Sequence, residues 1–303
     1  MKLCRFNDNQ VGLIKDDRII DITAPARRIE KCNAALRWSD PLIAGLGELS
    51  DVLDGDLSHL PWVPVGTAKL LSPVFRPGKL IGAPVNYQAH IDEMHASNVS
   101  PGHDIPDIKR AGLFLKATSS LVGASEGIAQ RFTDERTDHE VELAVVIGRT
   151  ASDIGEDVAL DYVAGYALGL DITLRGAADR SFRKSFDSYS VLGPWLTLAD
   201  ELIDPDHLEL RLTVNGIVRQ ATNTADMKLS AAGIIAFASR HYTLYPGDVI
   251  FTGTPQGVGP IRPGDNLVAA CEDLGEMEVA VRAYQPWQNP QPQPLLGGIS
   301  RLH

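Results

Sequence analysis

The stretch from residue 138 to 148, DHEVELAVVIG, alternates like a strand, yet both of its faces look buried. Side chains alternate across a strand, so the odd-numbered positions from 141 to 147 form one apolar face. The other face begins with Glu140 and Glu142 and continues with Ala144 and Val146. Two carboxylates at the end of a doubly covered strand repel each other and lose hydration. They therefore require a compensating cation or a shared proton.

Strand-like runs outnumber helical ones after residue 73. They are AGLFLKA, VELAVVIG, YALGLDITL, LGPWLTL, LELRLTVNGIVRQA, DVIFTGT and NLVAACEDLGEMEVAVRA. Asn215-Gly216 separates two alternating segments, which is a strong hairpin signal. A helix is expected from about Lys228 to His241. The pattern predicts an α+β chain that is mainly β, with an antiparallel, barrel-like or sandwich core.

Proline and glycine punctuation divides the chain into three parts. Residues 1–72 read as a small N-terminal domain with short strands and a helix from about Pro41 to Leu53, capped by Asp40. Residues 73–283 form the main domain, which starts with a strand at KLIGA and a helix near Asn86. Residues 284–303 are a Pro-rich tail, expected to be an extended arm or disordered.

Charge and cysteine content narrow the choice of partners and compartment. The 303 residues carry a formal net charge of -11, which argues against nucleic acid or an anionic membrane as a partner. A few local Lys and Arg residues can still dominate a pocket for an anionic substrate. No signal peptide or membrane-spanning run is recognisable, and the three cysteines are widely spaced without a CxxC motif. We expect a cytoplasmic protein with reduced thiols.

A third acidic residue accompanies Glu140 and Glu142. Asp171 lies in YALGLDITLRG, where apolar and polar residues alternate; taken alone, this pattern favours a half-exposed strand with a solvated aspartate. Three carboxylates on two strands nevertheless match the oxygen ligands of a hard divalent cation such as Mg²⁺. No His/Cys cluster suggests a softer metal.

The segment NYQAHIDEM places Tyr87, His90 and Glu93 at three-residue spacing, so a helix or 3₁₀ turn would bring them to one face. Glu93 could then bond one nitrogen of His90 and leave the other as a general base. An exposed amphipathic turn without a catalytic role explains the same spacing.

Basic residues and a glycine-rich loop complete the candidate groups. Lys116, Arg175 and Lys184 could each be an ordinary solvated charge. GDVIFTGTPQGVG follows a strand with Gly253, Thr254 and further glycines that permit close backbone approach to a ligand. The loop lacks the GKS/T ending of a nucleotide-binding P-loop.

In their order and spacing, these motifs resemble the fumarylacetoacetate hydrolase family. The carriers are NYQAHIDE, DHEVELAVVIG, VAGYALGLDITLR, RKSFDSYSVLGPW, VNGIVRQ and LYPGDVIFTGTPQGVG, and the resemblance extends through about residue 283. It implies a mixed β-roll fold and a homodimer.

The resemblance also implies roles for individual residues. Glu140, Glu142 and Asp171 match metal ligands for Mg²⁺, with Mn²⁺ or Ca²⁺ as alternatives. His90 and Glu93 match the dyad that activates water on a lid-like segment, with Lys184 as the third catalytic residue. The substrate-binding positions are Tyr87, Lys116, Arg175, Gly253 and Thr254.

The function implied is that of a divalent-metal-dependent hydrolase. It would cleave a carbon–carbon bond in a 2-oxo or 1,3-dicarbonyl acid, such as an acylpyruvate or a fumarylacetoacetate-like compound from aromatic catabolism. His90 would deprotonate water and Lys184 would stabilise the oxyanion, while the metal polarises the oxo acid. Decarboxylation, isomerisation and hydration are alternatives at the same site, and a non-catalytic module that binds a small acid is another.

Two segments depart from the family pattern. After Arg175, Gly176 and Ala178 stand where an aspartate and a glutamine are usual. The site therefore keeps its cations but loses a neutral hydrogen-bonding side chain, and Ala178→Gln should narrow the range of substrates. The segment Ala83-Pro84-Val85 before Asn86 is longer than the common form.

A pocket that relies on charge should reject substrates without a carboxylate next to the chelating carbonyl. We predict that an acylpyruvate is processed while its methyl ester loses about 100-fold or more in kcat/KM, because the ester leaves buried cations unpaired. Steady-state kinetics under conditions where the ester is chemically stable measures this difference. Comparable kcat/KM for acid and ester would show that the basic residues do not read the carboxylate.

Overall fold

The structure is a computed structural model that describes residues 1–53, 55, 57–97, 107–202 and 204–286. Most of the Pro-rich tail, from residue 287 to 303, lies outside the described residues. The predicted class is confirmed, because the chain is a mixed α+β fold that is mainly β.

Strands from the first 72 residues and from the following part of the chain share the largest sheet. Within the described residues this sheet has 12 strands in the order β4-β3-β2-β1-β14-β12-β11-β17-β6-β7, with β5 paired to β1 and β8 paired to β14. The bounds are β1 Lys2–Phe6, β2 Gln10–Lys15, β3 Arg18–Asp21, β4 Trp62–Pro64, β5 Leu70–Leu71, β6 Leu80–Gly82, β7 Phe114–Lys116, β8 Leu121–Val122, β11 Val141–Ile147, β12 Val163–Asp171, β14 Ser190–Leu198 and β17 Val249–Phe251.

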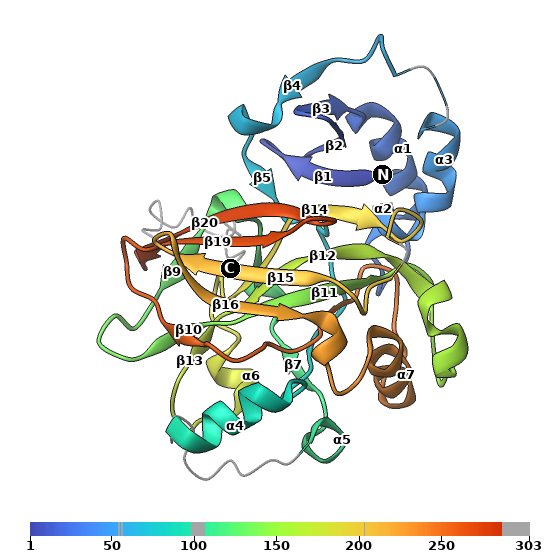
Figure 1. The fold of residues 1–303 in the computed structure, drawn as a ribbon. Coiled ribbons are helices and arrows are strands. Elements are labelled where there is room, and N and C mark those ends of the chain that lie inside the picture. The colour runs from blue at the N-terminus through green and yellow to red at the C-terminus, as the bar shows by residue number, and fades with distance from the viewer. Residues whose placement is uncertain (54, 56, 98–106, 203, 287–303) are drawn as a thin grey trace, which may run out of the picture.

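Two smaller sheets and several helices complete the described fold (Figure 1). A five-stranded sheet runs in the order β16-β15-β19-β20-β9, and a three-stranded sheet in the order β13-β10-β18. Their bounds are β9 Ile128–Gln130, β10 Thr137–His139, β13 Thr173–Leu174, β15 Glu209–Val214, β16 Ile217–Asn223, β18 Gly259–Pro260, β19 Asn266–Cys271 and β20 Gly275–Ala283. The helices are α1 Thr23–Asn33, α2 Pro41–Ala44, α3 Leu46–Leu53, α4 Gln88–Ser97, α5 Ile108–Ala111, α6 Arg180–Arg183 and α7 Ala231–His241.

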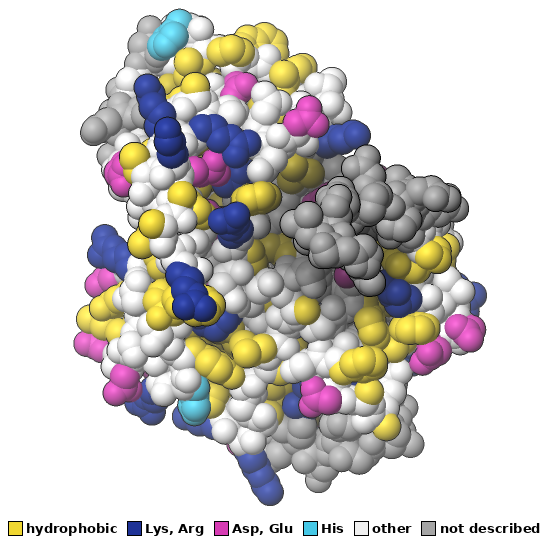
Figure 2. All heavy atoms as spheres, turned by 180° about the vertical axis from the view of Figure 1, so that it is seen from behind, with side chains coloured by type: hydrophobic (Ala, Val, Ile, Leu, Met, Phe, Trp, Pro, Cys, Tyr) yellow, Lys and Arg dark blue, Asp and Glu magenta, His cyan; other side chains and the backbone are white. Residues whose placement is uncertain are grey.

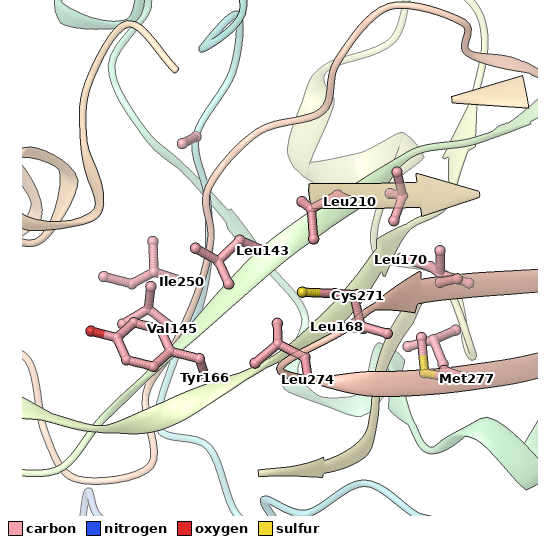
Figure 3. Packing of buried hydrophobic residues seen from close by; sticks show 14 of the residues in the cluster. Leu143, Val145, Tyr166, Leu168, Leu170, Leu210, Ile250, Cys271, Leu274 and Met277 are labelled. Atoms are coloured by element: carbon pink, nitrogen blue, oxygen red, sulfur yellow. The ribbon is translucent and has the colours of Figure 1, made fainter. Parts of the chain in front are cut away.

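The first hydrophobic core lies between the five-stranded sheet and one face of the large sheet. Figure 3 shows its members converging from β11, β12, β15, β17, β19 and β20. They include Leu143, Val145, Leu168, Leu170, Leu210, Ile250, Cys271 and Met277. Burial of these aliphatic side chains is the main stabilisation of the strands that carry the site.

The second hydrophobic core covers the opposite face of the large sheet. There Ala144 and Val146 of β11 belong to the same cluster as Ile29, Leu42 and Leu49 of the N-terminal helices. Both faces of β11 are therefore covered, as the sequence predicts. Because β1 pairs with β14, the N-terminal strands continue the main sheet. The domain division near residue 72 stays a proposal.

One interpretation of the sequence is wrong. The alternation around Asp171, taken alone, favours a half-exposed strand, but every residue of β12 is buried. The strand lies between β11 and β14 in the middle of the large sheet, so it has no edge or face open to water. The alternating composition correctly predicted a strand, but it wrongly predicted that one face of this strand is exposed to water.

The sequence predicts turns and helix caps more accurately than it predicts the burial of β12. Asn215 and Gly216 have φ angles of 52° and 77° between β15 and β16, as the predicted two-residue hairpin requires. The side chain of Asp40 accepts hydrogen bonds from the backbone of Leu42 and Ile43 and so caps α2.

Helix boundaries differ from the predictions by a few residues. The predicted helix from residue 41 to 53 is two helices, α2 and α3, interrupted at Gly45. A Cβ atom at Gly45 would lie 2.3 Å from Ile29 Cγ2, so the glycine permits close packing against α1. The helices expected near Asn86 and from Lys228 begin at Gln88 and Ala231.

The surface carries charges of both signs. On the face shown in Figure 2, basic, acidic and hydrophobic side chains are interspersed. Cys4, Cys32 and Cys271 are free. Among the helices of the described residues, none has the length and apolarity needed to span a bilayer.

Two isoleucines on strands provide a matched test of the first core. Ile250 is fully buried, whereas Ile217 is 57% exposed. We predict that Ile250→Ala lowers the free energy of unfolding by about 2–5 kcal/mol, because it leaves a cavity between the two sheets. Ile217→Ala should change it by less than about 0.5 kcal/mol. Urea denaturation measures both, and equal losses would contradict this description of the core.

Candidate active site and metal centre

The pairing of β11 with β12 brings the acidic residues together. Val141 lies opposite Leu170, and the backbone N–H of Asp171 donates a hydrogen bond of 2.9 Å to the carbonyl of Glu140. Carboxylate oxygens of Glu140, Glu142 and Asp171 all lie within 4.8 Å of one another, and all three residues are buried. The predicted cluster is therefore present at the shared end of two central strands.

Basic residues surround two of these carboxylates. Lys184 Nζ lies 2.7 Å from Glu140 Oε2 and 2.6 Å from Asp171 Oδ2. Lys116 Nζ donates to Asp171 Oδ1 at 2.5 Å and to the carbonyl of Tyr189 at 2.8 Å. Burial lowers the pKa of Lys116, and Asp171 opposes that shift.

Arg175 connects the cluster to a fourth acidic residue. Its Nη2 donates to Glu140 at 2.9 Å, and its Nε donates to Asp138 at 2.7 Å. Asp138 also accepts two hydrogen bonds from Arg136. Arg175 is therefore held in place by the protein, with its charge at the edge of the acidic cluster.

Glu142 is the carboxylate that most needs another cation. Burial and the neighbouring Asp171 raise its pKa well above the usual value, and the hydrogen bond the structure gives it is the 2.7 Å bond from the Gly253 N–H. Glu140 differs: burial raises its pKa, but Lys184 and Arg175 outweigh burial and hold the pKa well below its usual range. Three converging carboxylates, one of them without a basic partner among the described residues, fit a hard divalent ion.

His90 and Glu93 lie three residues apart on α4 and face each other. His90 Nδ1 is 3.4 Å from Glu93 Oε2, and both carboxylate oxygens of Glu93 accept from the Gly257 N–H at 3.0 Å. Burial raises the pKa of Glu93, but the hydrogen bonds from His90 and Gly257 outweigh burial and lower it. The carboxylate thus stays charged and orients the imidazole through Nδ1.

The backbone conformation and the close packing at position 257 require a glycine. Its φ is +92°, and a Cβ atom there would lie 2.1 Å from the carbonyl oxygen of Arg219. The close backbone approach predicted for this loop is therefore made to the protein itself. This close approach places the Gly257 N–H so that it donates to the carboxylate of Glu93.

A cavity of about 90 Å³ joins these groups. Of the predicted site residues, His90, Glu140, Glu142, Asp171, Arg175, Lys184 and Thr254 line it. Glu93, Lys116 and Gly253 do not line it but contact residues that do. The wall therefore holds the acidic cluster, the candidate base and cations together.

Tyr87 was predicted to share a helical face with His90, and that placement is wrong. It precedes α4, forms an isolated bridge with Met227 and is 1% exposed. Its hydroxyl has no hydrogen-bond partner among the described residues. Burial raises the pKa of Tyr87, and Glu142 adds to the shift.

Residue 178 is also placed differently from the expectation. Ala178 is exposed and lines a separate hollow beside Arg175, Phe182 and Arg183. The structure therefore gives no support to the expectation that a glutamine at this position would fill the cavity.

Several cavity residues were not recognised from the sequence. They are Met94, His95, Phe114, Arg180 and Arg183. The run RSFRK contains a visible basic cluster, but only the fold shows that Arg180 and Arg183 turn toward the cavity. Asp138 could have been found, because it shares the alternation of Glu140 and Glu142.

The fold and the site together define a class of enzyme with a buried acidic cluster that could hold a metal ion and with a histidine–glutamate pair beside it. Residues 79–282 match the family model described as "Fumarylacetoacetate (FAA) hydrolase C-terminal". The chain belongs to the fumarylacetoacetate hydrolase family.

Relatives of known activity share nearly the full length. A maleylpyruvate hydrolase of Aquipseudomonas alcaligenes is 46% identical over 93% of this chain and 100% of its own. The crystal structure of maleylpyruvate hydrolase from Sphingobium sp. SYK-6, with manganese(II) and pyruvate, is 35% identical, has a TM-score of 0.79 and covers 94% of this chain and 100% of its own.

A relative with a different reaction is more distant. A probable 2-hydroxyhepta-2,4-diene-1,7-dioate isomerase from Mycobacterium abscessus is 29% identical, with a TM-score of 0.73 and coverage of 94% of this chain and 100% of its own. The chain is a metal-dependent hydrolase of carbon–carbon bonds in ketonic acids, from a family that also contains isomerases.

The ligand role of Glu142 can be separated from a structural role. We predict that Glu142→Gln weakens Mn²⁺ binding by at least about 10-fold, because it removes a charged oxygen ligand. Chelator-treated Glu142→Gln should be at least as stable to heat as the chelator-treated parent, since it removes a buried, repelled charge. Calorimetric titration and thermal unfolding measure these effects.

Glu276, exposed on β20, gives the matched control for Glu142. Glu276→Gln should leave Mn²⁺ affinity unchanged. Unaltered affinity in Glu142→Gln would remove Glu142 from the set of metal ligands.

Proposed function

We propose that the protein hydrolyses acylpyruvates of the maleylpyruvate type, releasing pyruvate and a carboxylic acid. The observation that carries the proposal is the convergence of the buried acidic cluster, His90 and the cations Arg175 and Lys184 on one cavity. The likeness to two maleylpyruvate hydrolases, one of them with manganese and pyruvate, supports the same substrate class.

Glu140, Glu142 and Asp171 would hold the metal. A bound divalent ion supplies Lewis-acid polarisation of the 2-oxo acid group. Mg²⁺ is the ion we propose for the cell, with Mn²⁺ or Ca²⁺ as alternatives, because hard oxygen ligands accept each of them.

His90 acts as the general base. Glu93 holds Nδ1, so Nε2 is free to take a proton from water, and the resulting hydroxide adds to the acyl carbonyl remote from the oxo acid. The charge of Lys184 stabilises the oxyanion that forms. The carbon–carbon bond then breaks: the hydroxyl remains on the acyl carbon as a new carboxylic acid, and the proton held by His90 passes to the carbon that becomes the methyl group of pyruvate.

Arg175 positions the substrate carboxylate. Its guanidinium is fixed by Asp138 and Glu140, so binding an anion requires little further ordering of the side chain. Thr254 is fixed in turn, because it accepts from Gln220 and donates to the carbonyl of Val141. We propose that Lys116 acts through Asp171, and we place Gly253 as the support of Glu142.

Isomerisation and decarboxylation need the polarised oxo acid but no attacking water. The supported His90–Glu93 pair favours hydrolysis over both. The same pair argues against a module that only binds a small acid, because binding does not require a general base. A homodimer and a cytoplasmic location remain proposals from the family resemblance and from the sequence.

Replacement of His90 distinguishes hydrolysis from the alternative reactions, because only hydrolysis needs an attacking water. In Mn²⁺-loaded protein we predict that His90→Ala lowers kcat for maleylpyruvate cleavage by about 10²–10⁴-fold, as expected when a general base is lost. His207→Ala is the matched control, since His207 is exposed. Assays of pyruvate release with and without chelator provide the measurement.

Chelator should abolish cleavage and added Mn²⁺ should restore it in the parent and in His207→Ala. Unchanged cleavage in His90→Ala, or full activity of metal-free protein, would overturn this mechanism. Identification of a rearranged or decarboxylated product would establish an alternative reaction.

A further inference from the structure

The cavity has two cationic residues that the proposed mechanism does not use. Arg180 and Arg183 both lie on α6 and both line the cavity that contains the acidic cluster. The helix lies at the same end of the molecule as α4, which carries His90 (Figure 1). A ligand bound at the acidic cluster therefore shares the cavity with two further positive charges.

Arg183 is buried without adequate partners. Its side chain is 4% exposed, and its Nε has no hydrogen-bond partner among the described residues. Its Nη1 makes one long hydrogen bond of 3.4 Å to the carbonyl of Leu174. Burying a guanidinium in this way is costly, because the Nε–H loses water without gaining an acceptor.

The cations Arg175 and Lys184 of the cavity already have acidic partners. Arg175 pairs with Asp138 and Glu140, and Lys184 pairs with Glu140 and Asp171. Neither Arg180 nor Arg183 has an ion pair with any described residue. Burial lowers the pKa of Arg183 and the neighbouring Arg175 adds to this, while Glu140 opposes it. An arginine stays charged in such surroundings, so two positive charges face the cavity without a counter-ion.

We propose that Arg183, assisted by Arg180, forms a second anion subsite that binds the terminal carboxylate of a dicarboxylic acylpyruvate. This inference rests on the proposed function, since it assumes that the 2-oxo acid group binds at the acidic cluster. Arg183 is then a specificity-determining residue: the planar guanidinium offers paired donors to a carboxylate. Acylpyruvates that end in an alkyl group leave the same donors unpaired and are poor substrates.

Substrate pairs test the subsite directly. The Mn²⁺-loaded protein, Arg183→Met and Arg180→Met are assayed with maleylpyruvate and with acetylpyruvate, which lacks the terminal carboxylate. We expect Arg183→Met to lose about 10- to 100-fold more kcat/KM on maleylpyruvate than on acetylpyruvate, the scale of a lost charged hydrogen bond. The selective loss in Arg180→Met should be smaller, and Arg183→Lys should restore part of the preference.

Arg262 is the control, because it is exposed and does not line the cavity. Arg262→Met should match the parent on both substrates. Equal losses on the two substrates in Arg183→Met would reveal a structural role and overturn the subsite. No loss on either substrate would overturn it as well.

A binding experiment keeps this inference separate from the proposed function. Calorimetric titration of Mn²⁺-loaded protein compares maleate with its monomethyl ester, and neither measurement requires turnover. We expect the parent to prefer the dianion by at least about 10-fold and Arg183→Met to lose that preference. If the parent cleaves no acylpyruvate but shows this preference, the proposed function fails and the subsite stands. If the preference is absent, or survives in Arg183→Met, the subsite is wrong.

Discussion

The hydrogen bond between the Asp171 N–H and the Glu140 carbonyl, made where β11 meets β12, is the contact on which the site depends. It extends the ladder that pairs two fully buried strands, and this register brings three carboxylates together at one end of the sheet. A shift of one residue would turn one strand over relative to the other, so the carboxylates would no longer converge. The two cores therefore do more than stabilise the fold: they hold the register that places the acidic residues.

The acidic cluster could be predicted from the sequence for a simple physical reason. Paired glutamates in an apolar strand are costly without a cation, so the motif itself indicates chemistry. The hairpin at Asn215-Gly216 and the cap at Asp40 were predictable for a related reason, because each depends on local backbone geometry. The order and spacing of the motifs also indicated the fumarylacetoacetate hydrolase family and, with it, the β-roll fold.

The parts that failed depend on contacts between distant segments. Nothing in the alternation around Asp171 reveals that β14 covers its other edge. Tyr87 fits a helical spacing, but the bridge to Met227 holds it outside α4. Arg183 looks like an ordinary surface charge in RSFRKSF, and only the folded chain shows it buried on the cavity wall. The missing information in each case is the neighbour supplied by the fold.

The loop after β17 touches both halves of the site. The Gly253 N–H holds the acidic cluster through Glu142, and the Gly257 N–H holds Glu93 on α4. The first contact joins two central strands, whereas the second joins the loop to a helix through a single side chain. Displacement of α4 would therefore remove the general base His90 from the site while leaving the acidic residues in place. The acidic cluster and the histidine–glutamate pair are therefore supported by separate contacts of one loop.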